Sequence, residues 1–515
     1  MDSRREELTS VDARTGEVAS LATSSTPPDE LTSMARDAAA AVPYLCGLGR
    51  TGRAALLNQL ADALERRRSD IVDVADKETA LGGVRLNGEL TRTCVQLRFM
   101  AEVVAEGSYL NASIDHPGDT PMGVRPDLRR TSIPMGPVAV FGASNFPLAF
   151  SVPGGDTASA LAAGCPVIAK AHPSHVATSA LIAEIWLDEL QRFGAPPGVF
   201  SIVYGMDAGT ALILDPNIKA VGFTGSLAGG RALFDLAGRR ETPIPFYGEL
   251  GSVNPLVVTA AAADDRGESI GAGIAASMTL GVGQFCTKPG LFLIPASPAG
   301  DRVVEALVSG LRGVEPAYPL NAGIREAYRE GVARIATVAE VLVGQATTDG
   351  RQIGPVLAAA DVEAVVGDGQ RLLTHEIFGP FGLLVRYRET AEVLRVLRSL
   401  PATLTGTVHV GDADQDAAAI TTELENLSGR IVYNGYPTGV AVSWSMQHGG
   451  PYPASTVSAS TSVGAAAVGR WIRPLCYQDA PQSVLPDELR DTPSQPLPRR
   501  IDGRLITPTP QPGAN

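Results

Sequence analysis

Cysteine, aromatic residues and long apolar runs are all scarce in this chain of 515 residues. Its five cysteines are an odd number, widely spaced and without a CxxC pair, which argues against a disulfide framework and against a metal site. The longest uncharged stretches, 131–155 and 431–469, are interrupted by proline, glycine and polar residues, so we expect no membrane-spanning helix. No apolar stretch follows the charged first residues, which does not fit a secretory signal peptide, and a cytoplasmic location is the expectation.

An excess of basic residues is also lacking. Lys and Arg number 42 against 55 Asp and Glu, a net charge of -13 that offers no electrostatic footprint for nucleic acid or an anionic membrane. We therefore expect small molecules or further copies of the chain as partners. The hydrophobic content of 44% excludes general disorder, and the length exceeds what one core usually fills, so two large lobes are predicted.

Alternating apolar runs and helical patterns predict an α/β fold. The first forty residues are polar and are expected to form an extended arm, and an amphipathic helix is predicted from Arg53 to the charged run 65–68. Between 137 and 236 four apolar runs alternate with helical segments, which indicates a helix-covered parallel sheet, and a second such series begins at Pro255. The runs are Val138–Phe141, Val167–Ala169, Val199–Val203 and Ala220–Phe223, then Leu256–Val258, Leu291–Ile294, Leu383–Val385, Thr407–Val410 and Ile431–Tyr433.

Two glycine-containing segments are candidate dinucleotide sites. Residues 47–52 match GxGxxG in letters, but an alanine-rich helical segment precedes them instead of a strand, so we interpret them as a junction between helices. In residues 218–230 an apolar run leads into Gly225 and Ser226 and then a helical stretch containing Gly230. Such a helix N-terminus offers free N–H groups to a pyrophosphate, and the alternative is an ordinary strand-to-helix turn.

Polar side chains follow the ends of neighbouring strands. Asn145 comes after the run that ends at Phe141, and Lys170 directly follows the run that ends at Ala169. Because open parallel sheets bind ligands at the carboxyl ends of their strands, we expect these side chains near one site. Taken singly, their simpler alternatives are a turn residue and a surface lysine.

Three residues further along are candidates for chemistry. Cys286 lies in GQFCTKPG, where glycine and proline expose backbone near the sulfur, and its alternative is a small buried hydrophobe. Glu249 lies in FYGELG, an otherwise uncharged stretch where burial would raise its pKa toward that of a usable base; the alternative is a structural carboxylate. Glu376 in HEIFGP either accepts a hydrogen bond from a ribose hydroxyl or caps a turn.

Together these segments resemble the aldehyde dehydrogenase superfamily over residues 10–480. Residues 141–150, 448–453 and 473–478 resemble its 2-oxoglutarate semialdehyde (2,5-dioxopentanoate) dehydrogenase branch, and NADP-preferring fatty aldehyde dehydrogenases share much of them. The segments that occur in the family's order are Ser144-Asn145-Phe146-Pro147, Lys170, Phe223–Ser226, Glu249–Gly251, Gly283–Cys286 and Glu376–Pro380.

The resemblance implies a mechanism and a set of cofactor-binding residues. Cys286 would attack the aldehyde carbon, Asn145 and the Cys286 N–H would bind the oxyanion, and Glu249 would activate the water that hydrolyses the thioester. Glu249 thereby disfavours a coenzyme A-acylating enzyme. The implied cofactor-binding residues are Lys170, His172, Pro173, Gly225, Ser226, Gly230, Glu376 and Phe378.

The choice between NAD and NADP depends on one position. NAD-preferring relatives typically carry a glutamate three residues after the lysine, where it binds the ribose 2′-hydroxyl, and this chain has Pro173 there. Without that carboxylate a 2′-phosphate is not repelled, and Lys170 and His172 supply nearby donors. We therefore expect NADP to be tolerated, and it is the candidate for the preferred cofactor.

The resemblance also implies a domain organisation: a Rossmann-type cofactor lobe, a second α/β catalytic lobe and a small β arm. A homodimer or homotetramer is expected, in which a strand excursion near Ser113–Met135 pairs with a strand near Val463–Tyr477 of a neighbouring copy. The expected boundaries are 1–112 for the N-terminal arm and helices, 113–135 for the excursion, 136–250 for the dinucleotide-binding domain, 251–445 for the catalytic domain, 446–480 for the return to the arm, and 481–515 for a proline-rich extended tail.

The predicted function is NAD(P)-dependent oxidation of an aldehyde to the acid, with 2-oxoglutarate semialdehyde as the favoured substrate. Arg92 or Arg98 is the candidate for binding its distal carboxylate, against the simpler alternative of a structural ion pair. A medium-chain, long-chain or pathway-specific aldehyde is the enzymatic alternative. A catalytically silent cofactor-binding or structural protein is the alternative from another class, and the joint presence of Cys286, Glu249 and Asn145 argues against it.

Overall fold

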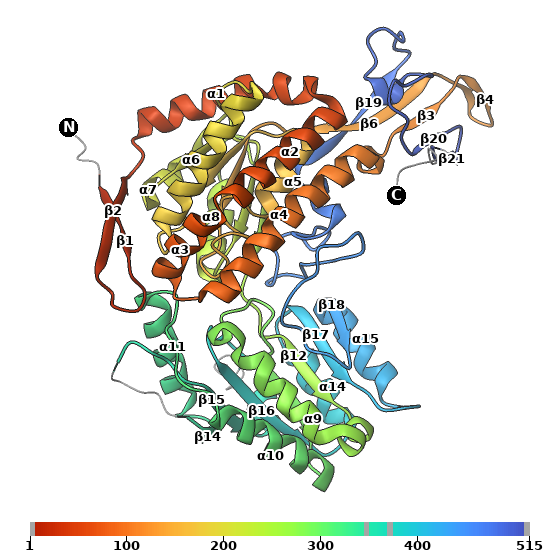
Figure 1. Ribbon diagram of the computed structural model, residues 1–515. Coiled ribbons are helices and arrows are strands. Elements are labelled where there is room, and N and C mark those ends of the chain that lie inside the picture. Colours follow the sequence, from red (N-terminus) through yellow and green to blue (C-terminus); the bar gives the residue numbers. More distant parts are fainter. Residues whose placement is uncertain (1–5, 345–349, 368–373, 509–515) are drawn as a thin grey trace.

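The chain forms two α/β lobes and a projecting arm. The computed structural model describes residues 6–344, 350–367 and 374–508. In Figure 1 the first lobe lies above the second, and the arm of strands extends from the first lobe. A short N-terminal hairpin of β1 (Glu7–Val11) and β2 (Val18–Ser24) packs beside the first lobe.

The first lobe is built on a five-stranded parallel sheet in the order β11-β10-β7-β8-β9. Its strands β7 and β8 are buried along their whole length, as expected where helices cover both faces. Helices α1, α7 and α8 contribute to the core on one face, and α2 to α6 to the core on the other. The elements are β7 (Val138–Phe141), β8 (Val167–Lys170), β9 (Phe200–Val203), β10 (Ala220–Thr224), β11 (Phe246–Glu249), α1 (Pro28–Gly47), α2 (Gly49–Arg66), α3 (Arg68–Thr79), α4 (Gly83–Glu106), α5 (Gly155–Ala163), α6 (Val176–Phe193), α7 (Met206–Leu214) and α8 (Leu227–Gly238).

The second lobe is built on a seven-stranded sheet in the order β14-β15-β16-β13-β12-β17-β18, parallel except for β14. Helices α9 and α10 contribute to the core on one face, and α11, α12, α14 and α15 to the core on the other. The elements are β12 (Pro255–Val258), β13 (Leu291–Pro295), β14 (Glu340–Val343), β15 (Val356–Ala360), β16 (Phe381–Tyr387), β17 (Thr403–His409), β18 (Ser428–Tyr433), α9 (Ala260–Thr279), α10 (Pro298–Arg312), α11 (Ala322–Ile335), α12 (Val362–Val366), α14 (Thr390–Ser399) and α15 (Ala417–Leu427).

The junction of the lobes follows from strand direction. The last residue of β11 is Glu249, and the chain enters β12 of the second sheet at Pro255. The first sheet therefore directs its carboxyl ends toward the junction, where the second sheet presents its amino ends. Asn145 follows β7 and Cys286 precedes β13, and both meet in this region.

The structure confirms most of the expected elements and corrects others. All nine predicted apolar runs lie in or overlap strands, and residues 47–52 form the junction of α1 and α2. The prediction that the polar first forty residues form an extended arm is wrong. The hairpin occupies part of them, and α1 buries Leu31, Ala35 and Ala38. Strands β11, β14 and β15 were not anticipated. Within the described residues no helix has the length and apolarity needed to cross a membrane.

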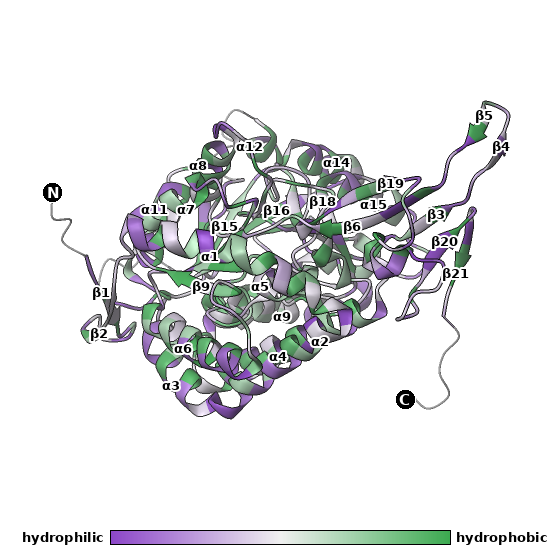
Figure 2. Ribbon diagram, turned by 90° about the horizontal axis from the view of Figure 1, so that it is seen from above, coloured by the Kyte–Doolittle hydropathy of each residue, from purple (hydrophilic) through white to green (hydrophobic). Residues whose placement is uncertain are grey.

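The arm is completed by the end of the same chain. Strand β6 (Leu128–Pro134) pairs antiparallel with β19 (Ile472–Gln478), so the predicted pairing with a neighbouring copy is wrong for this strand. The expected extended tail also folds back, and β20 (Arg499–Ile501) and β21 (Arg504–Ile506) extend the sheet beyond β3 (Ser113–Asp115). The prolines lie outside these paired residues, so they remove no ladder donor. Figure 2 shows β20 and β21 alongside the arm, whose tip is the hairpin of β4 (Gly118–Thr120) and β5 (Gly123–Arg125).

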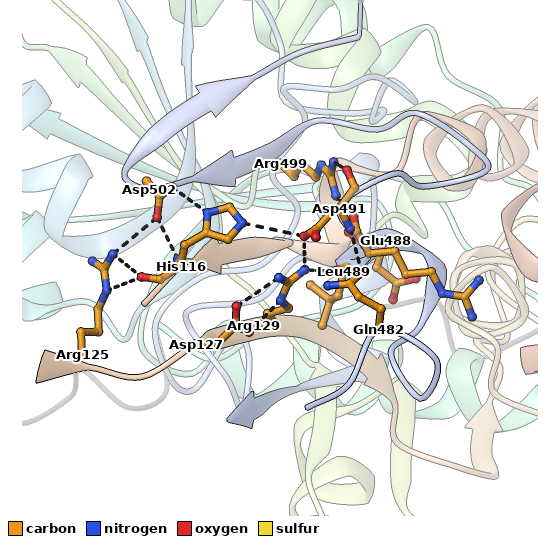
Figure 3. Close-up of polar contacts among 11 residues, drawn as sticks. His116, Arg125, Asp127, Arg129, Gln482, Glu488, Leu489, Asp491, Arg499 and Asp502 are labelled. Atoms are coloured by element: carbon orange, nitrogen blue, oxygen red, sulfur yellow. Dashed lines mark hydrogen bonds and ion pairs between the residues drawn. The ribbon is translucent and has the colours of Figure 1, made fainter. Parts of the chain in front are cut away.

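Ion pairs attach the tail to the arm (Figure 3). Arg129 of β6 is buried, and its guanidinium donates to Asp127 at 2.8 Å, to the carbonyl of Leu489 at 2.7 Å and to Asp491 at 2.7 Å. Near the tip, His116 lies 2.7 Å from the carboxylate of Asp502. A buried guanidinium with three acceptors leaves those acceptors unpaired when it is removed.

We expect Arg129→Met to lower the free energy of unfolding by about 2 kcal/mol, because it leaves a buried carbonyl and a partly buried carboxylate without their hydrogen-bond donor. Denaturant unfolding followed by circular dichroism measures the change. Arg500→Met on β20 is the control, since Arg500 is exposed and the one described acceptor of its side chain is the carbonyl of Gly503. An equal effect of the two substitutions would contradict the assignment of Arg129 as the attachment point.

Candidate active site

The loop that carries Cys286 is fixed from both sides. Asn254, in the segment before β12, donates from Nδ2 to the carbonyl of Cys286 at 2.7 Å and to that of Lys288 at 2.9 Å. On the other side Gly283 has φ +64°, and a β-carbon there would lie 2.4 Å from the backbone of Gly379. Only glycine permits this close approach, so the loop has one defined position against the segment 374–380.

Two hydrogen-bond donors converge near the sulfur. Asn145 donates from Nδ2 to the carbonyl of Gln284 at 2.9 Å, which leaves its second amide hydrogen for another acceptor. The backbone N–H of Cys286 has no acceptor among the described residues. The loop after Asn145 is held by Glu89, which accepts from the N–H groups of Leu148 and Ala149 at 2.9 and 3.0 Å. The arrangement suits stabilisation of an oxyanion on a carbon bonded to the sulfur.

The sulfur of Cys286 contacts a histidine. Its Sγ lies 3.6 Å from Nε2 of His448, whose Nδ1 is buried without a hydrogen-bond partner in the described part of the chain. Burial raises the pKa of the Cys286 thiol to about 12, and the charges of Glu249 and Glu376 act in the same direction. Burial and nearby arginines lower the pKa of His448 to about 3, so the imidazole is neutral. Sequence reasoning gave His448 no role, although it begins the quoted segment 448–453.

Glu249 has the environment expected of a base. It ends β11, its Oε2 accepts from the hydroxyl of Ser455 at 3.0 Å, and its Oε1 accepts from the guanidinium of Arg470. Burial raises the pKa of Glu249 to about 7, and the charge of Arg470 opposes this shift. The carboxylate can therefore exchange a proton near neutral pH.

A cavity of about 270 Å³ opens beside Cys286. Two arginines of α4 line it, Arg85 and Arg92, and each has a buried Nη1 without a hydrogen-bond partner among the described residues. Arg98 lies elsewhere and pairs with Asp62 at 2.7 Å, because six positions along a helix carry it to another face. Of the two arginines predicted from the sequence to bind the substrate carboxylate, Arg92 lines the cavity, and the prediction for Arg98 is wrong. Arg85 was not predicted. Three phenylalanines also line the cavity: Phe146, Phe150 and Phe285.

The cofactor-binding candidates around the first sheet fit a ligand with phosphates and hydroxyls. Lys170 is buried, and its only described side-chain contact is the sulfur of Met206 at 3.7 Å, so burial lowers its pKa to about 8. Ser226 caps α8 by accepting from the N–H of Gly229 at 3.2 Å, and the helix end beside Gly225 is exposed. An amine without an anion and an open helix N-terminus both suit a dinucleotide.

The other candidates have different surroundings. Glu376 is half-buried against Gly251, where a β-carbon would lie 2.3 Å from Oε2, and burial raises its pKa to about 7 while Lys288 opposes the shift. Phe378 is half-buried in the same segment. Gly230 serves packing, since a β-carbon there would lie 2.2 Å from the side chain of Leu250.

His172 and Pro173 line a second cavity, of about 480 Å³. The Nδ1 of His172 accepts from the N–H of Ser174 at 3.1 Å, and burial lowers the His172 pKa well below its usual value. The neutral ring therefore keeps its Nε2 hydrogen for a ligand. Arg325 lines the same cavity, and its guanidinium makes no hydrogen bond or ion pair with any described residue.

The profile of the Aldehyde dehydrogenase family matches residues 1–466. The chain belongs to this family. Alpha-ketoglutaric semialdehyde dehydrogenase 2 of Azospirillum brasilense is 45% identical over 88% of this chain and 87% of its own length, and alpha-ketoglutaric semialdehyde dehydrogenase of Acinetobacter baylyi is 43% identical over the same shares. A crystal structure of 1-pyrroline-5-carboxylate dehydrogenase from Thermus with bound NAD has a TM-score of 0.77 at 19% identity, over 92% of each chain, and shows the shared fold.

The predicted family, fold class and enzyme class are thereby confirmed. The protein is an aldehyde dehydrogenase, an oxidoreductase of a family that uses NAD or NADP. The two α/β lobes and the arm are the fold of its structural neighbours.

We expect His448→Asn to slow alkylation of Cys286 by iodoacetamide about tenfold at neutral pH, because the thiolate loses its hydrogen-bond partner. His448→Gln, which places an amide near the lost Nε2, should recover part of the rate. Peptide-resolved mass spectrometry separates Cys286 from the exposed Cys46 and Cys476.

The matched control for this experiment is His409→Asn, which alters a buried histidine of β17 away from the sulfur. Equal alkylation rates in the His448 and His409 variants would contradict a role for His448 at the thiol.

Proposed function

We propose that the protein oxidises 2-oxoglutarate semialdehyde to 2-oxoglutarate. The observation that carries the proposal is the pair of arginines, Arg85 and Arg92, which line the cavity beside Cys286 and each have an Nη1 without a hydrogen-bond partner among the described residues. The single carboxylate of Glu89 lies 3.8 Å from Arg85 and acts on both guanidinium groups, so positive charge is in excess here and favours a substrate that brings a carboxylate with it. The two relatives named for this activity, alike over most of their length, support the same substrate.

The residues at the sulfur have distinct roles in the proposed reaction. The thiolate of Cys286 attacks the aldehyde carbon, and Asn145 with the Cys286 N–H stabilises the oxyanion. Bound NAD(P) supplies the acceptor for the hydride that leaves this carbon, which produces a thioester. Glu249 takes a proton from water as the water oxygen attacks the thioester, and the carbon–sulfur bond breaks to release the acid.

The arginines bind the other end of the substrate. Arg92 donates from Nη2 to the carbonyl of Val440 at 3.1 Å, and its guanidinium lies 4.8 Å from the ring centroid of Phe150. These contacts fix its plane and leave Nη1 for the ligand. Arg85 lines the cavity and also donates to the carbonyl of Asn145 at 2.7 Å, so its substitution would affect both the cavity and the Asn145 loop. Arg92 is therefore the cleaner residue for a test of substrate recognition.

We expect Arg92→Met to lower kcat/KM for 2-oxoglutarate semialdehyde about 10- to 100-fold, since a charge-assisted hydrogen bond to the carboxylate is lost. Its kcat/KM for hexanal should stay within about threefold of the wild-type value, because hexanal has no carboxylate. Steady-state absorbance of the reduced cofactor measures both.

Arg98→Met is the control and should change neither value. Wild-type preference for hexanal over the oxo acid would overturn the substrate proposal and favour a medium- or long-chain aldehyde. Absence of turnover with any aldehyde would favour a silent member of the fold.

We also propose that NADP is accepted and preferred. Pro173 has no carboxylate to repel a 2′-phosphate, and the cavity that it lines contains the donors of His172 and the unpaired guanidinium of Arg325. Lys170 ends β8, two residues before His172 on the same segment. All of these groups are compatible with a phosphate and none requires the 2′-hydroxyl.

Pro173→Glu is expected to reduce the ratio of kcat/KM for NADP to that for NAD by about tenfold or more, because the new carboxylate repels the phosphate and accepts from a 2′-hydroxyl. The ratio is measured in one preparation, so a loss of folded enzyme does not change it. A wild-type enzyme that turns over NAD alone would contradict the proposal.

We also propose that the protein is a homo-oligomer and that it is located in the cytoplasm. Strand β19 lies at one edge of the arm sheet, and within a single chain its outer side has no partner strand among the described residues. An unpaired edge of this length is suited to pairing with a second copy, as a homodimer or homotetramer. All five cysteines are free, which fits a reducing compartment.

A further inference from the structure

A buried arginine connects Glu249 to a second carboxylate. Arg470 lies in the 3₁₀ helix Ala465–Trp471, and its side chain is only 1% exposed. Its Nη2 donates to Oε1 of Glu249, and its Nη1 donates to Oδ1 of Asp156 at 3.0 Å. Asp156 belongs to the first turn of α5, so three segments distant in sequence meet at one guanidinium.

The charges in this cluster do not balance. Two carboxylates share one guanidinium, and all three groups are buried, so the fully ionised cluster carries a net negative charge away from solvent. Burial raises the pKa of the Asp156 carboxyl as it does that of Glu249, and Arg470 opposes both shifts. The ring of Tyr247 lies 5.7 Å from the guanidinium, and burial raises its pKa, so it stays neutral. Two further titratable groups among the described residues interact with this cluster: the thiol of Cys286, on which Glu249 acts, and the neutral imidazole of His448, on which Arg470 acts.

The geometry leaves Asp156 little freedom. A β-carbon at Gly222 of β10 would lie 2.7 Å from Oδ2 of Asp156, so the carboxylate packs directly on the sheet. Both oxygens of Glu249 are also occupied, by Arg470 and by the hydroxyl of Ser455. An arginine that served Glu249 alone would hold its carboxylate as a stable ion pair and make it a weak base.

We propose that Asp156 and Arg470 are positioning residues for thioester hydrolysis, in which Asp156 shares the guanidinium and so keeps Glu249 oriented yet able to take a proton from water. The inference rests on the proposed role of Glu249 as the base. In the hydrolytic step a water proton passes to Glu249, the water oxygen bonds to the thioester carbon, and the sulfur leaves as the thiolate. Asp156 and Arg470 touch none of the reacting atoms.

Sharing of one cation predicts that loss of the Asp156 charge and loss of the Arg470 charge shift the pH dependence of hydrolysis in opposite directions. Asp156→Asn keeps the size and an acceptor oxygen but removes the charge, so Arg470 acts on Glu249 alone and makes it a weaker base. Arg470→Met removes the cation, so the two carboxylates repel each other and Glu249 holds its proton more tightly. A purely structural role for either residue would lower activity without moving the pH dependence in opposite directions.

The test uses p-nitrophenyl acetate and the full-length enzyme without cofactor. The ester transfers its acetyl group to Cys286 with release of p-nitrophenolate, and the slower phase that follows reports hydrolysis of the acetyl thioester. We expect the midpoint of the acid limb of this phase to fall by about one pH unit in Asp156→Asn, with a plateau rate about tenfold lower. In Arg470→Met the midpoint should rise by about one pH unit.

Two further variants keep the experiment decisive. Arg470→Lys retains the charge and should lie between the wild type and Arg470→Met, so it replaces the methionine variant if that chain does not fold. Asp127→Asn on the arm is the matched control, since it makes the same change beside the buried Arg129 and should leave the pH profile unchanged.

Glu249→Gln separates the inference from its premise. If this variant keeps the initial burst and loses the slow phase, Glu249 is the base, and unshifted midpoints in the Asp156 and Arg470 variants would then overturn the inference alone. Midpoints that move in the same direction in both variants would overturn it as well. If Glu249→Gln hydrolyses the thioester at the wild-type rate, the proposed base is wrong and the inference fails with it.

Discussion

The direction of the strands in two sheets decides where chemistry occurs in this enzyme. Strand β11 of the first sheet ends at Glu249, and the chain continues into β12 of the second sheet after only a short segment. Carboxyl ends of one sheet therefore meet amino ends of the other. Asn145 and Glu249 arrive from the first set of ends, and Cys286 arrives from the second. A nucleophile, an oxyanion donor and a base can meet only because the two sheets share this junction.

Charged side chains without complete partners are concentrated at the same junction. Among the residues that the structure describes, Lys170 has no carboxylate beside it, and Arg85 and Arg92 each have a buried N–H without an acceptor. Arg470 divides its charge between two carboxylates. Buried charges that lack partners cost stability in the free protein. Anionic ligands recover this cost when they bind, so the same residues that weaken the empty site select cofactor and substrate by charge.

Much of the fold could be predicted from the sequence, because fully buried parallel strands appear as apolar runs that need no partner information. The order of the motifs also placed Cys286 and Asn145 at one site, where the structure brings them together. The missed features depend on contacts between distant segments: Arg470 is separated from Asp156 by 314 positions and from Glu249 by 221. No local pattern records such contacts, and the three-residue strands of the tail are too short to have a periodicity.

The arm has a consequence for the order in which the molecule is made. Strand β6 finds its partner β19 only after roughly 340 further residues have been synthesised, which at ribosomal speed takes about 20–70 s. Strand β3 has β6 on one side, but its other edge waits longer still, because β20 lies in the tail. During this interval the arm strands expose unpaired backbone, the kind of edge that chaperones shield and that neighbouring chains on a polysome can capture. Residues 472–501 thus complete a sheet that residues 113–134 began.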